Sequence, residues 1–147
     1  MALQLVGFKE LLHKMKRVSY DAPVATAFGA YEGLQEIIKD AKERAPKDTK
    51  MMAMSGYVTP PSVRDGAAVS MEAGFGGGSE DYVVRVHEDL TMPHPNGGEA
   101  KFFSNAMDAG RGNLLDTIKK HVTAYLKTGR TTPAKKVVPA SPYEDRP

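Results

Sequence analysis

The chain has 147 residues, which is enough for one domain with a sizeable core. It contains no cysteine, and this excludes disulfides, thiolate metal ligands and cysteine nucleophiles. The formal net charge of +2 points to no class of partner. No apolar run approaches the length of a membrane span, and the first residues become charged too soon for a signal peptide. We therefore expect no membrane partner.

Two helices are predicted before the first strand. Residues 5–18 carry one apolar stripe at helical spacing, formed by Phe8, Leu11, Leu12, Met15 and Val18. Such a stripe packs on the sheet of its own chain or binds a partner, and we favour packing. The second helix begins with Asp21 as N-cap and Pro23 in the first turn, and it ends near Arg44 because Pro46 follows.

Beyond Pro46 the apolar period changes from 3.6 to 2, which predicts strands. The first strand runs from Met51 to Val58 and is broken by Thr59-Pro60-Pro61-Ser62, since proline cannot serve a central ladder. The second runs from Ala67 to Phe75. The glycine-rich run Gly74–Ser79 then either binds phosphate or turns a hairpin. We favour the turn, because acidic residues and a further strand are expected after it.

The stretch from Glu80 to Phe103 begins as that further strand. Its two faces alternate, with Tyr82, Val84 and Val86 on one and Val83, Arg85 and His87 on the other. A loop rich in proline and glycine, Leu90–Glu99, follows. A connection of this length is typical of functional loops, so we expect it to project from the sheet and contact another chain.

The last helix is predicted over residues 104–126, with a kink or break at Gly110-Arg111-Gly112. The fold class is therefore α+β: a three- or four-stranded, mainly antiparallel sheet packed with two N-terminal helices and one long C-terminal helix. Residues 1–127 form this single domain. Residues 128–147 form a Pro-rich, basic tail with few large apolar residues, which we expect to be extended and to become ordered only against a partner.

Four polar residues raise the question of catalysis or metal binding: His87, Glu88, Asp89 and His94. Imidazole and carboxylate groups are common ligands of zinc and iron, so a metal-dependent hydrolase is one alternative function. Neighbouring residues on a strand point to opposite faces, however, and the spacing matches no helix-borne metal motif. We therefore expect no catalytic residues, no metal and no cofactor, and we predict that the chain is not an enzyme.

A basic segment without acidic residues follows in the last helix and the tail. Its cations are Lys119, Lys120, Lys127, Arg130, Lys135 and Lys136. Tyr125 is the only aromatic residue among them, so no platform for stacking bases is expected. Nonspecific contact with the DNA backbone is the second alternative function, and these six residues are the candidates to face DNA.

The order of three short motifs resembles a known family. A helix ends in Ala45-Pro46-Lys47-Asp48-Thr49, the segment YVVRVHEDL follows after two strands, and Gly98-Glu99-Ala100-Lys101-Phe102-Phe103 leads into the last helix. This order resembles the tail-completion, or head–tail joining, minor capsid proteins in the neck of tailed bacteriophages. That family has Ala-Pro-x-Asp-Thr-Gly, then Tyr-Ala-x-x-Val-(His)-Glu, then a Lys-Phe or Lys-Tyr entry. The resemblance covers about Phe8 to Leu126, and Lys50 and Val83 depart from it.

The resemblance implies a structural virion protein with no catalytic residues. Copies would form a homo-oligomeric ring, usually sixfold, between the head connector (portal) and the tail, and DNA would pass through the lumen without sequence-specific contact. Partners would be other neck proteins, such as the head adaptor and the tail terminator or tail tube. The protein would be assembled in the host cytoplasm and located in the virion neck.

We expect three segments to contact other subunits: the predicted strand that begins at Glu80, the loop that follows it and the tail. The candidates are His87, Glu88, Asp89, Leu90, His94, Pro95, Val137 and Val138. The two valines would be accepted as an extended segment, for example at a sheet edge. Lys135 and Lys136 would be attracted to an acidic patch, such as one around Glu80, Asp81 and Glu88 of the next copy.

Overall fold

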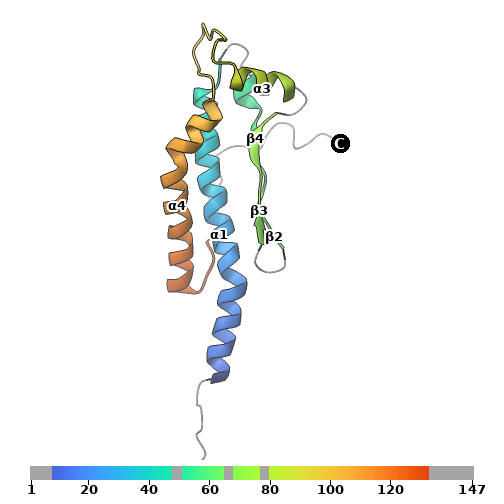
Figure 1. Ribbon diagram of the computed structural model, residues 1–147. Coiled ribbons are helices and arrows are strands. Elements are labelled where there is room, and N and C mark those ends of the chain that lie inside the picture. The colour runs from blue at the N-terminus through green and yellow to red at the C-terminus, as the bar shows by residue number, and fades with distance from the viewer. Residues whose placement is uncertain (1–7, 48–50, 65–67, 77–79, 133–147) are drawn as a thin grey trace, which may run out of the picture.

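The computed structural model describes residues 8–47, 51–64, 68–76 and 80–132. Two long helices, α1 (Phe8–Arg44) and α4 (Phe102–Thr128), run antiparallel side by side (Figure 1). Between them in sequence come the remaining elements: α2 (Met51–Met54), β1 (Gly56–Val58), β2 (Ser62–Arg64), β3 (Ala68–Ser70), β4 (Ala73–Phe75) and α3 (Glu80–Glu88). The chain therefore combines helices and strands and has a long C-terminal helix. This part of the predicted fold class is confirmed.

One continuous helix, α1, replaces the two helices predicted at the N-terminus. Pro23 lies inside it, and Asp21 is not an N-cap. Proline costs a helix one backbone hydrogen bond, but α4 packs across this point. The hydroxyl of Tyr125 donates to the Arg17 carbonyl oxygen and to Asp21 Oδ2, both at 3.3 Å. The prediction of a break was wrong because tertiary contacts hold the two halves in line. The predicted end at Arg44 is confirmed.

The two long helices approach closely because small residues line their contact. Ala25, Gly29 and Gly33 recur at four-residue spacing on the buried face of α1. A Cβ on Gly33 would stand 3.0 Å from the Cα of Leu114. On the other side, a Cβ on Gly110 would stand 2.4 Å from Ile37 Cγ1. The break predicted at residues 110–112 was wrong: α4 runs through them, and Gly110 serves close packing.

The strands form one long, interrupted hairpin. β1 pairs antiparallel with β4, with Gly56 opposite Phe75, and β2 pairs antiparallel with β3, with Val63 opposite Val69. The strand break at the prolines of residues 60 and 61 is confirmed, and the amide of Thr59 bridges it by donating to the Glu72 carbonyl at 2.7 Å. Strands were correctly predicted within residues 67–75. Residues 51–54 are helical, so only 56–58 of the first predicted strand are extended.

The third predicted strand is the helix α3, and the prediction of a three- or four-stranded sheet was wrong at this point. The apolar residues of VVRVHE are nearly continuous, so the segment matches both the 3.6-residue period of a helix and the two-residue period of a strand. Val86 is buried and Val83 half-buried, whereas Tyr82 and Val84 are exposed. The hairpin turn predicted after Phe75 was also wrong, since α3 follows β4; residues 77–79 lie outside the described part.

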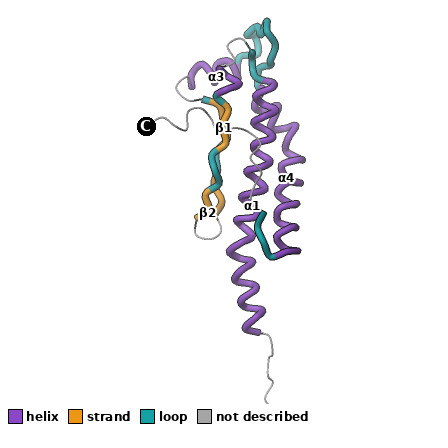
Figure 2. Tube along the Cα trace, turned by 180° about the vertical axis from the view of Figure 1, so that it is seen from behind, coloured by secondary structure: helices purple, strands orange, loops and turns teal. Residues whose placement is uncertain are grey.

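The core lies at one end of the helix pair. Its buried members come from α1, the residue that follows α1, α2, α3 and α4: Ile37, Ala41, Ala45, Met52, Val86, Phe102 and Ala106. At the other end, the first turns of α1 extend beyond the end of α4 (Figures 1 and 2). Leu11 and Met15 are exposed there. The prediction that this stripe packs on the sheet was therefore wrong. No described helix is long and apolar enough to span a membrane.

Candidate functional site

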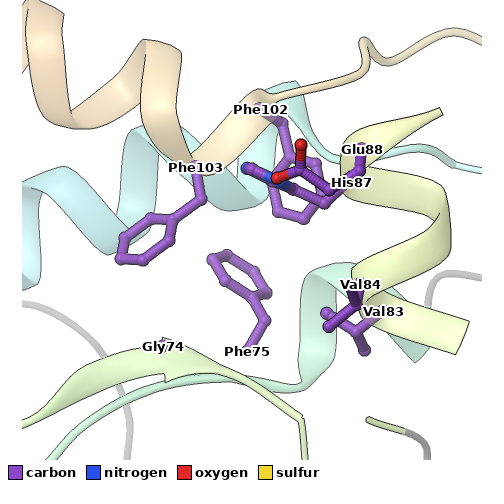
Figure 3. Close-up of a pocket in the computed structure, with 8 residues that line it drawn as sticks. All are labelled: Gly74, Phe75, Val83, Val84, His87, Glu88, Phe102 and Phe103. Carbon is purple, nitrogen blue, oxygen red and sulfur yellow. The ribbon is translucent and has the colours of Figure 1, made fainter. Parts of the chain in front are cut away.

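A pocket of about 240 Å³ opens where β4, α3 and the start of α4 meet (Figure 3). Its walls are mostly apolar: Gly74, Phe75, Val83, Val84, His87, Glu88, Phe102 and Phe103. The ring of Phe75 meets Phe102 edge to face, with centroids 5.0 Å apart and planes at 89°. Phe103 lies against the same ring at 5.7 Å. Edge-to-face packing fixes the three rings relative to one another and gives the pocket a rigid aromatic wall.

The polar side of the pocket is one imidazole and one carboxylate. His87 Nδ1 donates to Glu88 Oε1 at 2.7 Å, and its ring lies 5.2 Å from that of Phe102. This tautomer leaves Nε2 to accept from Ser104 Oγ at 3.4 Å. The hydrogen bond from His87, and then the charge of Lys101, hold the pKa of the Glu88 carboxyl below its ordinary value. Glu88 is thus an anion at neutral pH.

The His87–Glu88 pair is arranged differently from the sequence prediction and belongs to no metal-binding cluster among the described residues. The sequence predicted that His87 and Glu88 point to opposite faces of a strand; on α3 they instead bond to each other. Lys101 Nζ approaches the other carboxylate oxygen of Glu88 at 3.7 Å. Within residues 8–47, 51–64, 68–76 and 80–132, no three His, Asp or Glu side chains converge in a way that could hold a metal ion. The pocket is chemically an apolar socket with an acidic rim.

The loop 90–99 lies on the C-terminal end of α1 instead of projecting from a sheet. The amide of Lys47 donates to the Gly97 carbonyl at 3.1 Å, and the amide of Glu99 donates to the Arg44 carbonyl at 2.9 Å. A Cβ on Gly98, which has a φ of 103°, would stand 2.5 Å from the Cα of Pro46. Only glycine fits this backbone and this distance.

The predicted contact residues in this region have different environments. Leu90 is 72% exposed, and Pro95 is exposed as well. Asp89 accepts from the amide and the hydroxyl of Thr91 at 2.9 and 2.6 Å, and these bonds lower the pKa of its carboxyl. Both ring nitrogens of His94 are buried without a hydrogen-bond partner in the described chain. Of the predicted contact residues in the loop, Leu90 and Pro95 are therefore the exposed ones.

The cations proposed to face DNA lie partly on α4. Lys119, Lys120 and Lys127 are exposed and border a shallow depression that also contains Asp116. Arg130 is exposed just after the helix, which ends at Gly129 with a left-handed φ of 66°. The predicted basic segment begins at Lys119 and has no acidic residue, but on α4 Asp116 lies one turn before Lys120 and borders the same depression. The other predicted residues, Lys135, Lys136, Val137 and Val138, lie outside the described residues, as does most of the tail.

The apolar walls of the pocket were missed by sequence reasoning. Phe75 was read as a strand residue, and the Phe102–Phe103 pair as a helix entry. Phe75 precedes residues 82–86 and the Phe102–Phe103 pair follows them, but this spacing does not show that the segments meet.

Comparisons of the sequence with protein-family models, with curated proteins and with solved structures each found no match.

Proposed function

We propose that the protein is a structural component of the neck of a tailed bacteriophage. In this role it forms a ring that joins the DNA-filled head to the tail and lets DNA pass through. The proposal rests on the order of the three sequence motifs. Its further support is that segments of the same three motifs, distant in sequence, pack together at one end of the molecule.

The contacts between these segments are specific. The first motif meets the third where Gly98 packs on Pro46. The second meets the third where the amide of Lys101 donates to the His87 carbonyl at 2.7 Å. Lys101 has a left-handed φ of 54°, so this entry into α4 adopts a conformation that few lysines have. The motifs thus act as one structural unit, which gives a physical reason for their order in the chain.

The test is to locate the protein in purified phage particles. Mass spectrometry of the virion, combined with antibody labelling in electron micrographs, should place it at the junction of head and tail. Disrupting its gene should give filled heads and free tails that do not join. Normal infectious particles without the protein would contradict the proposal.

A second function, nonspecific DNA binding, is favoured by one observation. Lys119, Lys120 and Lys127 are exposed along α4 and carry a local excess of positive charge. The same face would suit the lumen of a DNA-conducting ring, so this property also fits the first proposal. Salt-dependent affinity, argued in the Discussion, tests it directly.

A further inference from the structure

The N-terminal turns of α1 carry an apolar stripe that no described part of the chain covers. Leu11 is 53% exposed and Met15 60%, and Leu12 and Val18 lie beside them with 41% each. Single exposed apolar residues are normal, but a contiguous stripe indicates a contact surface. The flanking side chains include Lys9, Lys14 and Lys16 beside Glu10, so three cations accompany one carboxylate, while Arg17 pairs with Asp21 at 3.6 Å and donates to the Gly129 carbonyl oxygen at 3.2 Å.

The pocket on the other end of the molecule is complementary to this stripe, because it is apolar and has acidic residues beside it. Its walls are apolar and Val84, at its edge, is 60% exposed. The sequence of α3, EDYVVRVHE, holds three carboxylates and one arginine, and Asp89 follows it, so acidic residues still outnumber basic ones when Lys101, 3.7 Å from Glu88, is included. The pKa of Glu88 is lowered mainly by the His87 hydrogen bond, so this carboxylate stays charged. A volume of about 240 Å³ has room for a large apolar side chain, since one water occupies only about 30 Å³.

These two surfaces lie at opposite ends of the helix pair (Figure 1). Because α1 is one rigid helix, a single chain cannot bring its own first turns to its own pocket. Pairing of two α1 stripes would place like charges together, whereas α1 against α3 pairs opposite charges. We propose that the first turns of α1 in one copy dock through Leu11 and Met15 into the pocket of a second copy.

A head-to-tail contact of this kind is heterologous. Within the described residues, each copy offers an uncovered α1 stripe at one end and an open pocket at the other. The contact can therefore repeat from copy to copy, and it closes into a ring where the rotation between copies allows. Two exposed apolar side chains and one pocket carry the proposed contact, which is far fewer than the roughly 20–30 residues a side of a standard stable complex. Individual contacts are therefore weak, and closure of the ring provides the remaining stability. This inference rests on the proposed function only for its biological setting, because self-association is measurable without virions.

The test uses the full-length protein and measures its mass by sedimentation and light scattering over a range of concentrations. Met15→Glu places a charge in the apolar stripe, and Val84→Arg blocks the pocket and repels the basic helix. Both residues are exposed, so thermal unfolding should be unchanged; Leu11→Glu is a second variant of the stripe. The matched control is Leu115→Glu, since Leu115 is 60% exposed on α4 and lies in neither surface.

The wild type and the control should associate, and Met15→Glu and Val84→Arg should each lose about tenfold or more in association constant. At the highest concentrations, where a single weak contact is populated without ring closure, an equal mixture of Met15→Glu and Val84→Arg should form a one-to-one dimer and nothing larger. That result is specific to a head-to-tail contact, because one variant keeps its pocket and the other keeps its helix.

A wild type that stays monomeric, variants that still associate, or a mixture that does not pair would each overturn the inference. If the wild type associates and the variants do too, the proposed docking surfaces are wrong, and the copies associate through another surface. If the mixture pairs but virions lack the protein, the docking stands and the proposed function fails.

Discussion

Gly29 in α1 lies directly against the backbone of Ile118 in α4. A Cβ on Gly29 would stand 2.6 Å from the Ile118 Cα, 3.2 Å from its amide nitrogen and 3.1 Å from the carbonyl oxygen of Thr117. Backbone atoms cannot move aside as a flexible side chain can, so the distance between the two helices depends on the missing side chain. The contact is the closest backbone approach between α1 and α4 among the glycines described.

Gly29→Ala should therefore destabilise the protein by about 1–3 kcal/mol, because overpacking outweighs the better helix propensity of alanine. Gly112→Ala is the matched control in α4. Nothing lies within 4 Å of its missing Cβ, so this substitution should stabilise the helix by up to about 1 kcal/mol. Urea denaturation of both variants measures the difference. Equal effects of the two substitutions would contradict the close packing.

Local signals in the sequence predicted the features that depend on local chemistry. The end of α1 before Pro46, the strand break at Pro60 and the extended segment ending at Phe75 were all correct. Local signals failed where contacts between residues far apart in the sequence determine the structure. α1 continues past Pro23 where α4 packs on it, and one contact there joins Asp21 to Tyr125, which lies 104 residues away. No local pattern carries that information.

The candidate site was predictable by residue type but not by geometry. His87 and Glu88 were selected because imidazole and carboxylate groups recur at functional sites, and both line the pocket. The pocket itself exists only because Phe75 of β4 meets Phe102 of α4. A strand in place of α3 would point His87 and Glu88 to opposite faces, so the hydrogen bond between them was not predicted.

Phe102 is the largest fully buried side chain, and it joins the core to the pocket. Phe102→Ala should destabilise the protein by about 3–5 kcal/mol, because it removes an aromatic ring from a packed site and leaves a cavity. Leu126→Ala, at a residue 62% exposed on the same helix, should change stability by less than about 0.5 kcal/mol. Denaturant unfolding compares them. A small loss for Phe102→Ala would show that the core is not organised around this ring.

Glu99 links the loop to both long helices. The hydrogen bond from Asn105, and then the one from Arg44, hold the pKa of its carboxyl below the ordinary value. A lowered folded-state pKa means that the carboxylate stabilises the fold above its unfolded pKa, and that this contribution is lost as the pH falls through the folded pKa. Glu99→Gln should therefore be less stable than the wild type at neutral pH, and the difference should shrink in acid.

Thermal unfolding of wild type and Glu99→Gln from neutral pH down to about pH 3 measures this convergence, since ordinary glutamate titrates near pH 4.3. The control is Glu43→Gln, an exposed residue one turn before Lys47. A stability difference between Glu99→Gln and the wild type that does not change with pH would show that the carboxylate charge is not what anchors the loop.

The exposed cations of α4 give a prediction about DNA. Lys119→Gln combined with Lys127→Gln should weaken binding to duplex DNA of any sequence. In a plot of log affinity against log salt concentration, the slope should become shallower by about 0.9 for each phosphate contact removed. Lys39→Gln combined with Lys47→Gln removes the same charge from exposed sites elsewhere. Equal losses for the two double variants would mean that net charge, and not this face, determines binding.

Leu90 gives the sharpest test of the loop as a contact surface. It is 72% exposed, so Leu90→Asp should leave the unfolding temperature unchanged while reducing the yield of joined particles. Leu126→Asp is the control at a residue of similar exposure on α4. Deleting residues 92–96 should behave differently, because Met92 packs against the core and His94 is turned inward. That deletion should lower stability as well as assembly. If Leu90→Asp particles form in normal yield, the exposed part of the loop does not contact another protein in the virion.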